Sequence, residues 1–289
     1  MFPSDQPVVV ATDLSTASEE ALRQAHAWAA GRPLIAVHAL ADPTPIFAPI
    51  GEMQRYVEQL RQLRAKREEE LREHVHATLK DAEARAEAHV GSPADVVLRV
   101  AEEQRAALVV VGATGRGSVE RALLGTTADQ ILRSADRPVL VARPSGPGPI
   151  VAATDLSEPS APALEAGVAA SRLLARPLVA LHALDIAHPV LAAFEPSLVI
   201  DVQTRQQLHA AVREVLRAGI ERHGHEATSE VQEGPPARVI SERAQTLGAS
   251  LIVVATHGRT GVARIALGSV AADVGRGASC SVLVVRSKR

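Results

Sequence analysis

Apolar residues along this chain fall into two alternating patterns. Short continuous runs of Val, Ile, Leu and Ala, such as residues 8–12, are typical of strands that are buried on both faces. Between such runs, apolar residues recur at helical spacing. In the long segment 52–82 they are Val57, Leu60, Leu63, Leu71, Val75 and Leu79. Strands that alternate with amphipathic helices predict a doubly wound α/β fold, in which helices cover both faces of a parallel sheet.

The first half of the chain is predicted to hold five strands and four helices. The strands are expected at residues 8–12, 33–40, 84–90, 107–112 and 138–142. The helices are expected at residues 15–31, 52–82, 93–105 and 126–134. Ser15 or Thr16 can cap the first helix, Thr16 with Glu19 would form a capping box, and Gly31 would end the helix.

The second half of the chain repeats the first. The run VVVATDLS at 8–15 returns as IVAATDLS at 150–157, and RPLIAVHAL at 32–40 returns as RPLVALHAL at 176–184. The offset stays between 142 and 144 residues, which indicates a duplication with very small insertions. Any feature that serves a function in one copy can therefore be checked in the other.

A short linker separates the two copies. The segment RPSGPGP at residues 143–149 is rich in Pro and Gly, which favour neither helix nor strand. We predict the domain boundary inside it, which gives two tandem doubly wound domains, 1–145 and 146–289. Domains of about 145 residues are of ordinary length.

Composition and charge exclude several classes of function. Aromatic residues make up 2% of the chain, so a surface that stacks nucleic-acid bases is not expected, and the net charge of −2 gives no field that attracts nucleic acid or a membrane. No apolar run reaches the roughly 20 residues of a membrane helix, and the N-terminus lacks the features of a signal peptide. The single cysteine, Cys280, rules out an internal disulfide. These features favour a cytoplasmic protein without nucleic-acid or membrane partners.

A glycine-rich loop follows the predicted strand at 107–112. Its spacing is G-x2-G-x9-G-T, at Gly112, Gly115, Gly125 and Thr126. Glycines at a strand end allow positive φ and close approach to the backbone, and the helix that begins after Gly125 offers unpaired N–H groups to an anion. The pattern is neither a P-loop nor the G-x-G-x-x-G dinucleotide motif. One such loop is consistent with a phosphate site or with a structural turn.

The second copy of the loop changes one glycine. Ala255 stands where the first copy has Gly112, whereas Gly258, Gly268 and Ser269 are kept. The added methyl group costs little if φ is negative and about 1 kcal/mol or more if φ is positive. We predict that the second loop still binds the same kind of ligand.

Basic and histidine side chains near the loops leave alternatives open. Two arginines of each loop are equally consistent with a phosphate contact and with solvent exposure: Arg116, Arg121, Arg259 and Arg264. His38 recurs as His182 at the end of the second strand, where a structural or hydrogen-bonding role is favoured over a ligand role. His74 and His76 are two apart on a helix and should point to different faces. The sequence shows no conspicuous metal-binding cluster.

The repeated motifs together resemble a known family. The ATDLS and HAL strand ends and the G-x2-G-x9-G-[ST] loop are similar to those of the universal stress proteins in their tandem form, over nearly the whole chain. The resemblance implies a five-stranded parallel sheet in order 3-2-1-4-5 in each domain. The loop is the motif of the ATP-binding branch, which implies ATP, often with Mg²⁺, at each site. No residue can be assigned as a Mg²⁺ ligand.

The resemblance also implies roles for single residues. Asp13 and Asp155 would lie at the nucleoside, and the main chain of Ala39 and Ala183 would meet the adenine. The phosphates of the first site would be held by Gly112, Gly115, Arg116, Gly125, Thr126 and Thr127. Those of the second site would be held by Ala255, Gly258, Arg259, Gly268, Ser269 and Val270.

We expect an ATP-binding stress-response or regulatory protein that acts by nucleotide-dependent conformation or partner choice. One alternative is a slow ATPase or nucleotidyl transferase, although Asp13 is the only candidate for a general base. Another is a scaffold without nucleotide, which the intact first loop disfavours. In single-domain relatives two chains commonly pair through the last strand, so residues 139–141 and 282–284 are expected to form an intramolecular pseudo-dimer. A homodimer of the tandem chain is also consistent with the family.

Overall fold

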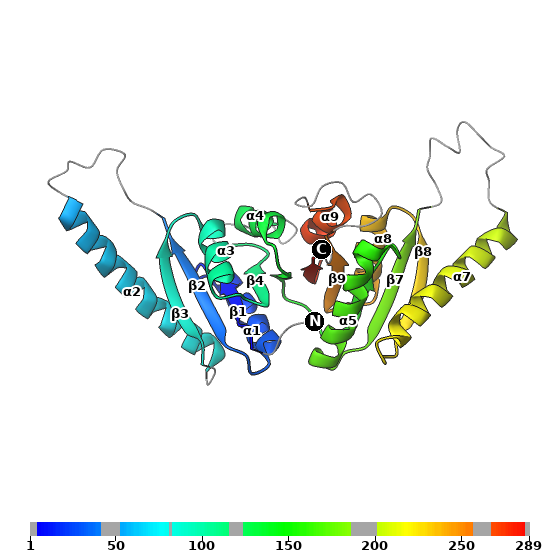
Figure 1. Ribbon diagram of the computed structural model, residues 1–289, viewed down its shortest axis with the longest axis horizontal. Coiled ribbons are helices and arrows are strands. Elements are labelled where there is room, and N and C mark those ends of the chain that lie inside the picture. Colours follow the sequence, from blue (N-terminus) through cyan, green and yellow to red (C-terminus); the bar gives the residue numbers. More distant parts are fainter. Residues whose placement is uncertain are drawn as a thin grey trace, which may run out of the picture. The chain divides into compact units, whose positions relative to one another are not determined.

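The computed structural model describes residues 5–41, 53–80, 83–115, 124–185, 201–256 and 267–286 of the chain. They form two compact units, one that ends at Arg143 and one that begins at Pro144. Each unit has five parallel strands with helices on both faces (Figure 1).

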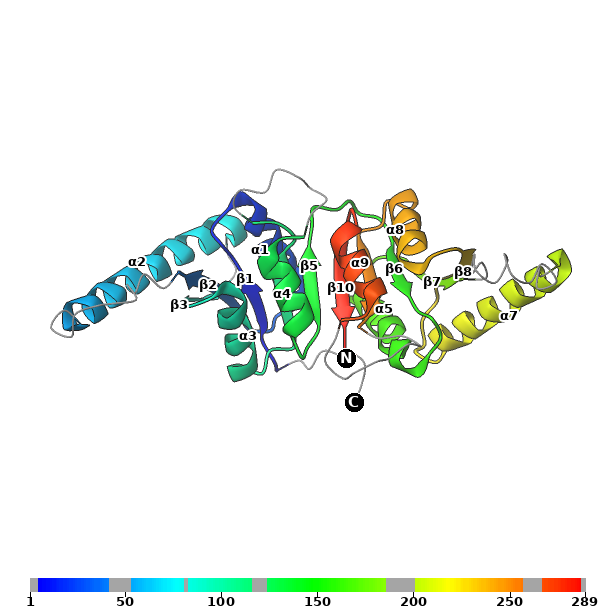
Figure 2. The ribbon, with the colours of Figure 1, turned by 90° about the horizontal axis from the view of Figure 1, so that it is seen from above.

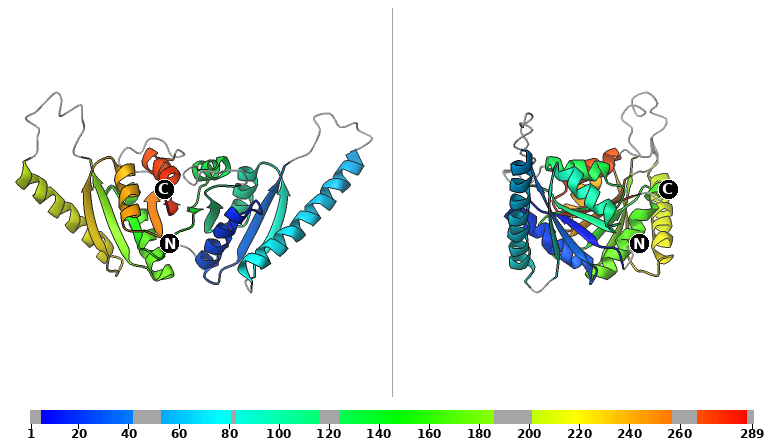
Figure 3. Two further views of the ribbon diagram at one scale, coloured as in Figure 1. Left: turned by 180° about the vertical axis from the view of Figure 1, so that it is seen from behind. Right: turned by 60° about the vertical axis from the view of Figure 1, so that its left-hand side comes forward.

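The first unit has the predicted doubly wound architecture. Its strands are β1 (Val8–Ala11), β2 (Leu34–Leu40), β3 (Arg85–Val90), β4 (Leu108–Gly112) and β5 (Val139–Ala142). Its helices are α1 (Thr16–Ala29), α2 (Met53–Leu79), α3 (Pro93–Glu103) and α4 (Thr126–Ser134). Paired strands run parallel in the order β3-β2-β1-β4-β5, which confirms the predicted 3-2-1-4-5 order. Helices α1 and α2 lie against one face of the sheet, and α3 and α4 against the other (Figure 3).

The second unit repeats this architecture. Its strands are β6 (Ile150–Ala153), β7 (Leu178–Leu184), β8 (Thr228–Glu233), β9 (Leu251–Ala255) and β10 (Ser281–Val285). Its helices are α5 (Ala161–Leu174), α7 (Val202–Glu221), α8 (Pro236–Thr246) and α9 (Ser269–Gly277), and a short 3-10 turn (Glu158–Ser160) precedes α5. The strand order is β8-β7-β6-β9-β10, again parallel. Figure 2 shows α5 and α7 on one face of this sheet and α8 and α9 on the other.

Aliphatic residues fill the core on both faces of the central strands. Val8, Val9 and Val10 of β1 have no exposed surface, and the register places Val9 beside Ile35 of β2 and Val109 of β4. Branched side chains suit a sheet that is buried on both faces. A core of this kind needs few aromatic rings, which is consistent with an aromatic content of 2%.

The start of α1 decides between the two predicted caps. Ser15 is the N-cap, and its hydroxyl accepts a hydrogen bond from the Ser18 N–H at 3.3 Å. Thr16 is therefore the first helical residue, and the capping box predicted for Thr16 and Glu19 is wrong. The tight turn before the helix, with Leu14 at φ 62°, decides which hydroxyl reaches the first turn.

The apolar face predicted for the long helix is buried only in its second half. Leu71 and Val75 of α2 are buried, whereas Val57 is 39% exposed. The sheet covers only part of a helix of 27 residues, so helical periodicity alone overstated the buried length.

Candidate functional site

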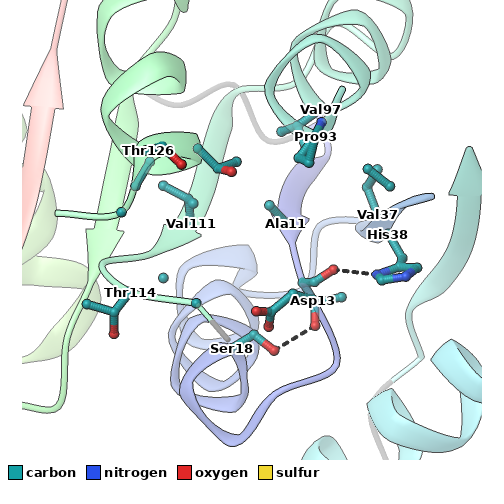
Figure 4. A pocket seen from close by; sticks show the side chains of 17 residues that line it. Ala11, Asp13, Ser18, Val37, His38, Pro93, Val97, Val111, Thr114 and Thr126 are labelled. Atoms are coloured by element: carbon teal, nitrogen blue, oxygen red, sulfur yellow. Dashed lines mark hydrogen bonds between the residues drawn. The ribbon is translucent and has the colours of Figure 1, made fainter. Parts of the chain in front are cut away.

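A cavity of about 540 Å³ opens at the carboxyl ends of β1, β2 and β4 (Figure 4). This is where the strand order of the first unit reverses, the usual ligand position in such sheets. The volume lies within the range of small-molecule sites. Val37 and Val111 from the sheet and Pro93 and Val97 from α3 provide apolar walls. The cavity lining includes seven predicted site residues of the first unit: Asp13, Ala39, Gly112, Gly115, Gly125, Thr126 and Thr127.

Asp13 is held by the turn that leads from β1 into α1. Its Oδ1 atom accepts hydrogen bonds from the Ser15 N–H at 3.1 Å and from the Ser15 hydroxyl at 2.5 Å. Its Oδ2 atom lies toward the loop after β4, because a Cβ atom built on Gly115 would be 2.9 Å away from it. The carboxylate therefore lies between the end of β1 and the glycine loop, as an acceptor on the cavity wall.

Two of the loop glycines are needed for space, and none of the three is needed for backbone conformation. Gly112, Gly115 and Gly125 all lie outside the left-handed region, so the loop does not use the positive φ that glycine allows. Gly115 leaves room for the carboxylate of Asp13. A Cβ atom on Gly112 would lie 3.3 Å from the Thr114 carbonyl oxygen, a tight but smaller conflict.

The N-terminus of α4 faces the cavity. Gly125 is the N-cap without a side-chain cap, and its own N–H donates to the Ala113 carbonyl at 2.7 Å, which closes the loop. The N–H groups of the first turn belong to Thr126, Thr127 and Ala128, which all line the cavity. A helix leaves these groups without intrahelical acceptors, so they are available to an anion in the cavity.

Strand β2 continues past the end of β1. The last main-chain bond between them runs from the Thr12 N–H to the Val37 carbonyl, at 3.0 Å. On the other side of β2, the Leu40 carbonyl accepts from the Gly91 N–H at 2.9 Å. Successive residues of a strand direct their main-chain groups to opposite neighbours, so the N–H and C=O of Ala39 are directed toward β1.

After the end of β1, the main-chain groups that would pair with Ala39 make other hydrogen bonds. The Thr12 carbonyl accepts a hydrogen bond from His38 Nδ1 at 2.9 Å (Figure 4). The Leu14 N–H donates to the Thr12 hydroxyl oxygen at 3.1 Å. The Thr12 hydroxyl also contacts Ser18 Oγ at 2.8 Å. Among the described residues, neither main-chain group of Ala39 has a partner on β1, so Ala39 presents one donor and one acceptor to the cavity that it lines.

The same arrangement occurs at the end of β6 in the second unit. The Thr154 N–H donates to the Leu181 carbonyl at 3.1 Å, and the Thr154 carbonyl accepts from His182 Nδ1 at 2.8 Å. The Leu156 N–H donates to the Thr154 hydroxyl oxygen at 3.0 Å. Among the described residues, the main-chain N–H and C=O of Ala183, two strand positions beyond Leu181, likewise have no partner on β6.

The second unit also keeps the acceptor and the helix terminus. Asp155 Oδ1 accepts from the Ser157 N–H at 3.0 Å. The Gly268 N–H donates to the Thr256 carbonyl at 2.8 Å, and α9 begins at Ser269 without a side-chain cap. The polar elements of the first site therefore have counterparts in this unit.

The substitution at Ala255 causes no backbone strain. Ala255 ends β9 outside the left-handed region, so its methyl group does not carry the larger of the two predicted penalties. Val270 is the second residue of α9, in the helical turn that would face a bound anion. Other residues of the predicted second and first sites lie outside the described residues: Gly258, Arg259, Arg264, Arg116 and Arg121.

Two hydroxyl residues of the site were not predicted from the sequence. Thr12 and Ser18 both line the cavity, and their counterparts Thr154 and Ser160 are bonded at 2.7 Å. The pattern T-D-L-S-x-x-S occurs at the end of the first strand in both copies and was the available signal. Its meaning depends on which hydroxyl faces which main-chain group, and that is a property of the folded turn.

Neither a metal centre nor a membrane helix is found in the described part of the chain. Within it, no three His, Cys, Asp or Glu side chains gather closely enough to bind a metal ion. None of its helices combines the length and the apolar character needed to cross a membrane.

Comparison with known proteins identifies the family. The model of the universal stress protein family matches residues 6–143 and again 148–286. A universal stress protein of Mycolicibacterium smegmatis is 27% identical over 305 residues, 97% of each chain, and one of Mycobacterium tuberculosis is 28% identical over 294 residues, 96% of each chain. A solved universal stress protein of Archaeoglobus fulgidus has the same fold, with a TM-score of 0.68 at 18% identity over 97% of this chain and 98% of that one. The chain therefore belongs to the universal stress protein family and contains two tandem domains of that family.

Proposed function

We propose that this protein binds one ATP molecule in each domain and acts as a regulator whose conformation or partner choice depends on the bound nucleotide. The observation that carries the proposal is the first cavity. It combines an apolar slot, the open main-chain pair of Ala39, the carboxylate of Asp13 and the N-terminus of α4. These elements are the complements of a base, a sugar hydroxyl and a phosphate.

Each part of the nucleotide has a matching group in this arrangement. Adenine carries an acceptor, N1, beside a donor, the N6 amino group, which matches the N–H and C=O of Ala39. A ribose hydroxyl can donate to the carboxylate of Asp13. Phosphate oxygens suit the N–H groups at the start of α4, where the helix dipole also favours negative charge. Mg²⁺ would accompany the phosphates, with water and phosphate oxygens as its ligands.

The second domain supports a second site of the same kind. Asp155, Ala183 and the start of α9 at Ser269 repeat the elements of the first site. Ala255 adds a methyl group without backbone strain. We therefore propose that both domains bind ATP, with Gly258 and Arg259 contributing as the family resemblance implies.

Rapid hydrolysis is not part of the proposal. Among the described residues of the cavity lining, Asp13 and His38 are the acidic and imidazole side chains, and each makes a hydrogen bond at the end of β1. The family resemblance places Asp13 at the nucleoside, away from the terminal phosphate where a general base would act. We expect phosphate release close to background when purified protein is incubated with ATP and Mg²⁺, and sustained release would favour the slow ATPase.

Equilibrium dialysis tests the proposed binding directly. The purified chain, stripped of nucleotide by denaturation and refolding, should take up two ATP per chain in the presence of Mg²⁺. An adenine absorbance and an ATP mass in the supernatant of the denatured protein would independently support the proposal. No ATP uptake would favour the nucleotide-free scaffold, and one ATP per chain would contradict the second site.

Two wider expectations belong to the same proposal. We propose a cytoplasmic location and an intramolecular pairing of the last strands, residues 139–141 with 282–284. Crosslinking between cysteines introduced at Val139 and Val282 would test that pairing. A homodimer of the tandem chain would be tested by the mass in solution with and without ATP.

A further inference from the structure

We propose that His38, and His182 in the second domain, are positioning residues that keep the main chain of the neighbouring alanine open for the adenine base. The inference deepens the proposed function and rests on it. A parallel strand normally uses its N–H and C=O groups to pair with the next strand. The inference explains why those of the alanine remain available to a ligand.

The imidazole of His38 occupies the carbonyl oxygen of Thr12. If the pairing of β1 with β2 continued, that carbonyl would accept a hydrogen bond from the Ala39 N–H. A carbonyl can only accept, so the contact at 2.9 Å means that His38 Nδ1 carries a proton and donates it to Thr12. The Ala39 N–H is thereby left for a ligand in the cavity.

The hydroxyl of Thr12 leaves the main-chain carbonyl of Ala39 without its ladder partner. The ladder partner of the Ala39 carbonyl would be the Leu14 N–H, which instead donates to Thr12 Oγ1 at 3.1 Å. Ser18 Oγ donates to the Ser15 carbonyl at 2.8 Å, so Thr12 Oγ1 must be the donor in its 2.8 Å contact with Ser18. This chain of hydrogen bonds fixes the Thr12 hydroxyl as the acceptor for Leu14.

The second domain repeats both diversions. His182 Nδ1 donates to the Thr154 carbonyl at 2.8 Å, and the Leu156 N–H donates to Thr154 Oγ1 at 3.0 Å. Ser160 Oγ donates to the Ser157 carbonyl at 2.9 Å. In both domains, a histidine and a threonine therefore bind the carbonyl and the N–H that would otherwise pair with the alanine.

The open pair selects among purine bases. An N–H donor and a C=O acceptor on one residue complement the N1 acceptor and N6 donor of adenine. Hypoxanthine presents the opposite polarity, with a donor at N1 and an acceptor at O6. The arrangement therefore favours ATP over inosine triphosphate, and the preference depends on the histidine that keeps the pair open.

Asn and Gln substitutions separate this role from a general structural one. The side-chain amide of Asn can place an N–H near the position of His Nδ1, whereas that of Gln reaches toward the position of Nε2. We expect His38→Asn to retain ATP binding at the first site. We expect His38→Gln to weaken it by about tenfold or more, as the loss of a good hydrogen bond implies. Tripolyphosphate, which needs only the helix terminus, should bind both variants as it binds the wild type.

The full chain with its two sites supplies the matched control. In equilibrium dialysis, His38→Gln should reduce tight ATP sites from two to one, His182→Gln should do the same, and the double variant should have none. Thr12→Val removes the hydroxyl without changing the side-chain volume greatly, and it should weaken ATP binding as His38→Gln does. The preference for ATP over inosine triphosphate should fall in each weakened site.

Three results would overturn the inference. They are unchanged ATP binding in both His38→Gln and Thr12→Val, equal loss of tripolyphosphate and ATP, and failure of His38→Asn to bind better than His38→Gln. A wild-type protein that binds tripolyphosphate but not ATP would instead overturn the adenine assignment in the proposed function. The two failures are therefore distinguishable.

Discussion

At the scale of single residues, the site depends on glycine at position 115, which has no side chain. Gly115 lies beside Asp13, and a Cβ atom on it would come within 2.9 Å of the carboxylate oxygen Oδ2. Ser15 holds the other oxygen through its N–H and its hydroxyl, so the carboxylate cannot move away freely. The absent methyl group thus keeps an acceptor at a defined place in the cavity.

Gly115→Ala should therefore weaken ATP binding at the first site. The overpacking displaces Asp13 or the loop, and we expect a loss of about 1–2 kcal/mol, or roughly tenfold in Kd, by isothermal titration calorimetry. Gly277→Ala is the control, because a Cβ atom there meets nothing within 4 Å. Equal affinity in Gly115→Ala and wild type would show that the carboxylate is not constrained as described.

His74 makes the stability of the first domain depend on pH. Its Nε2 atom is buried without a hydrogen-bond partner, and burial, opposed by the nearby carboxylates of Glu19 and Asp13, lowers the pKa of the imidazole. The unfolded state then binds the proton more readily than the folded state. The free energy of unfolding therefore falls as the pH drops through the ordinary value of about 6.5.

Replacing His74 by Leu should flatten this dependence. Urea denaturation at pH 7.5 and pH 5.5 should show a smaller loss of stability in His74→Leu than in wild type. His76→Leu is the control, since His76 lies exposed on the same helix. If the two variants respond to pH alike, burial of His74 does not govern the effect.

At the scale of elements, the duplicated sequence predicted the strands and helices of the first domain, apart from end positions. It did so because continuous apolar runs and helical periodicity are local properties of the chain. Of the two caps predicted for α1, Ser15 is the one used, and the capping box at Thr16 and Glu19 was wrong, because the choice depends on the folded turn around Leu14. The open edge at Ala39 was not derivable from spacing, because it needs His38 to contact a residue 26 positions away.

In the second domain, packing of α5 against the sheet requires glycine where helix propensity would favour alanine. Gly167 lies in α5, where Ala normally stabilises a helix by about 1 kcal/mol relative to Gly. A Cβ atom on Gly167 would, however, lie 2.6 Å from the Ala152 side chain and 3.2 Å from Leu178 Cδ1. Close contact between α5 and β6 therefore needs glycine at this position.

Gly167→Ala should destabilise the second domain in spite of its helix propensity. Overpacking lowers the free energy of unfolding by about 1–3 kcal/mol, whereas replacing Gly by Ala in a helix raises it by about 1 kcal/mol. The net effect should therefore be destabilising. Gly219→Ala in α7 is the matched control, since its Cβ atom would meet Leu164 Cδ1 at 3.4 Å, an ordinary contact. We expect denaturation midpoints to fall for Gly167→Ala and to stay or rise for Gly219→Ala. The reverse order would contradict the packing described for α5.

At the scale of the whole molecule, the two units repeat the same polar elements. The described residues that line the first cavity all belong to the first unit, between Ala11 and Ala128. The corresponding elements of the second site all come from the second unit, from Asp155 to Ser269. Two relatives align over 96–97% of this chain, so the sequence similarity spans both domains. A substitution in one domain should therefore leave the contacts of the other site intact.

Proline at the first position of α4 or α9 tests this independence. Thr126→Pro and Ser269→Pro each remove one N–H and one hydroxyl, yet the preceding glycines, at φ −64° and ψ 153° and at φ −60° and ψ 149°, already have the conformation that a following proline requires. Both helices should persist. ATP at 100 times its Kd stabilises a domain by about 2.7 kcal/mol and should slow hydrogen exchange of its core strands accordingly.

Hydrogen exchange followed by mass spectrometry reads the two domains separately, through peptides from β4 and β9. In wild type, ATP should slow exchange in both. Thr126→Pro should lose that protection in β4 and keep it in β9, and Ser269→Pro should do the opposite. Thr126→Ala, which removes only the hydroxyl, should lose less protection than Thr126→Pro, because the N–H remains. If either proline variant lost protection in both domains, one site would depend on the other, and the duplicated sites would have to be treated as a single coupled unit.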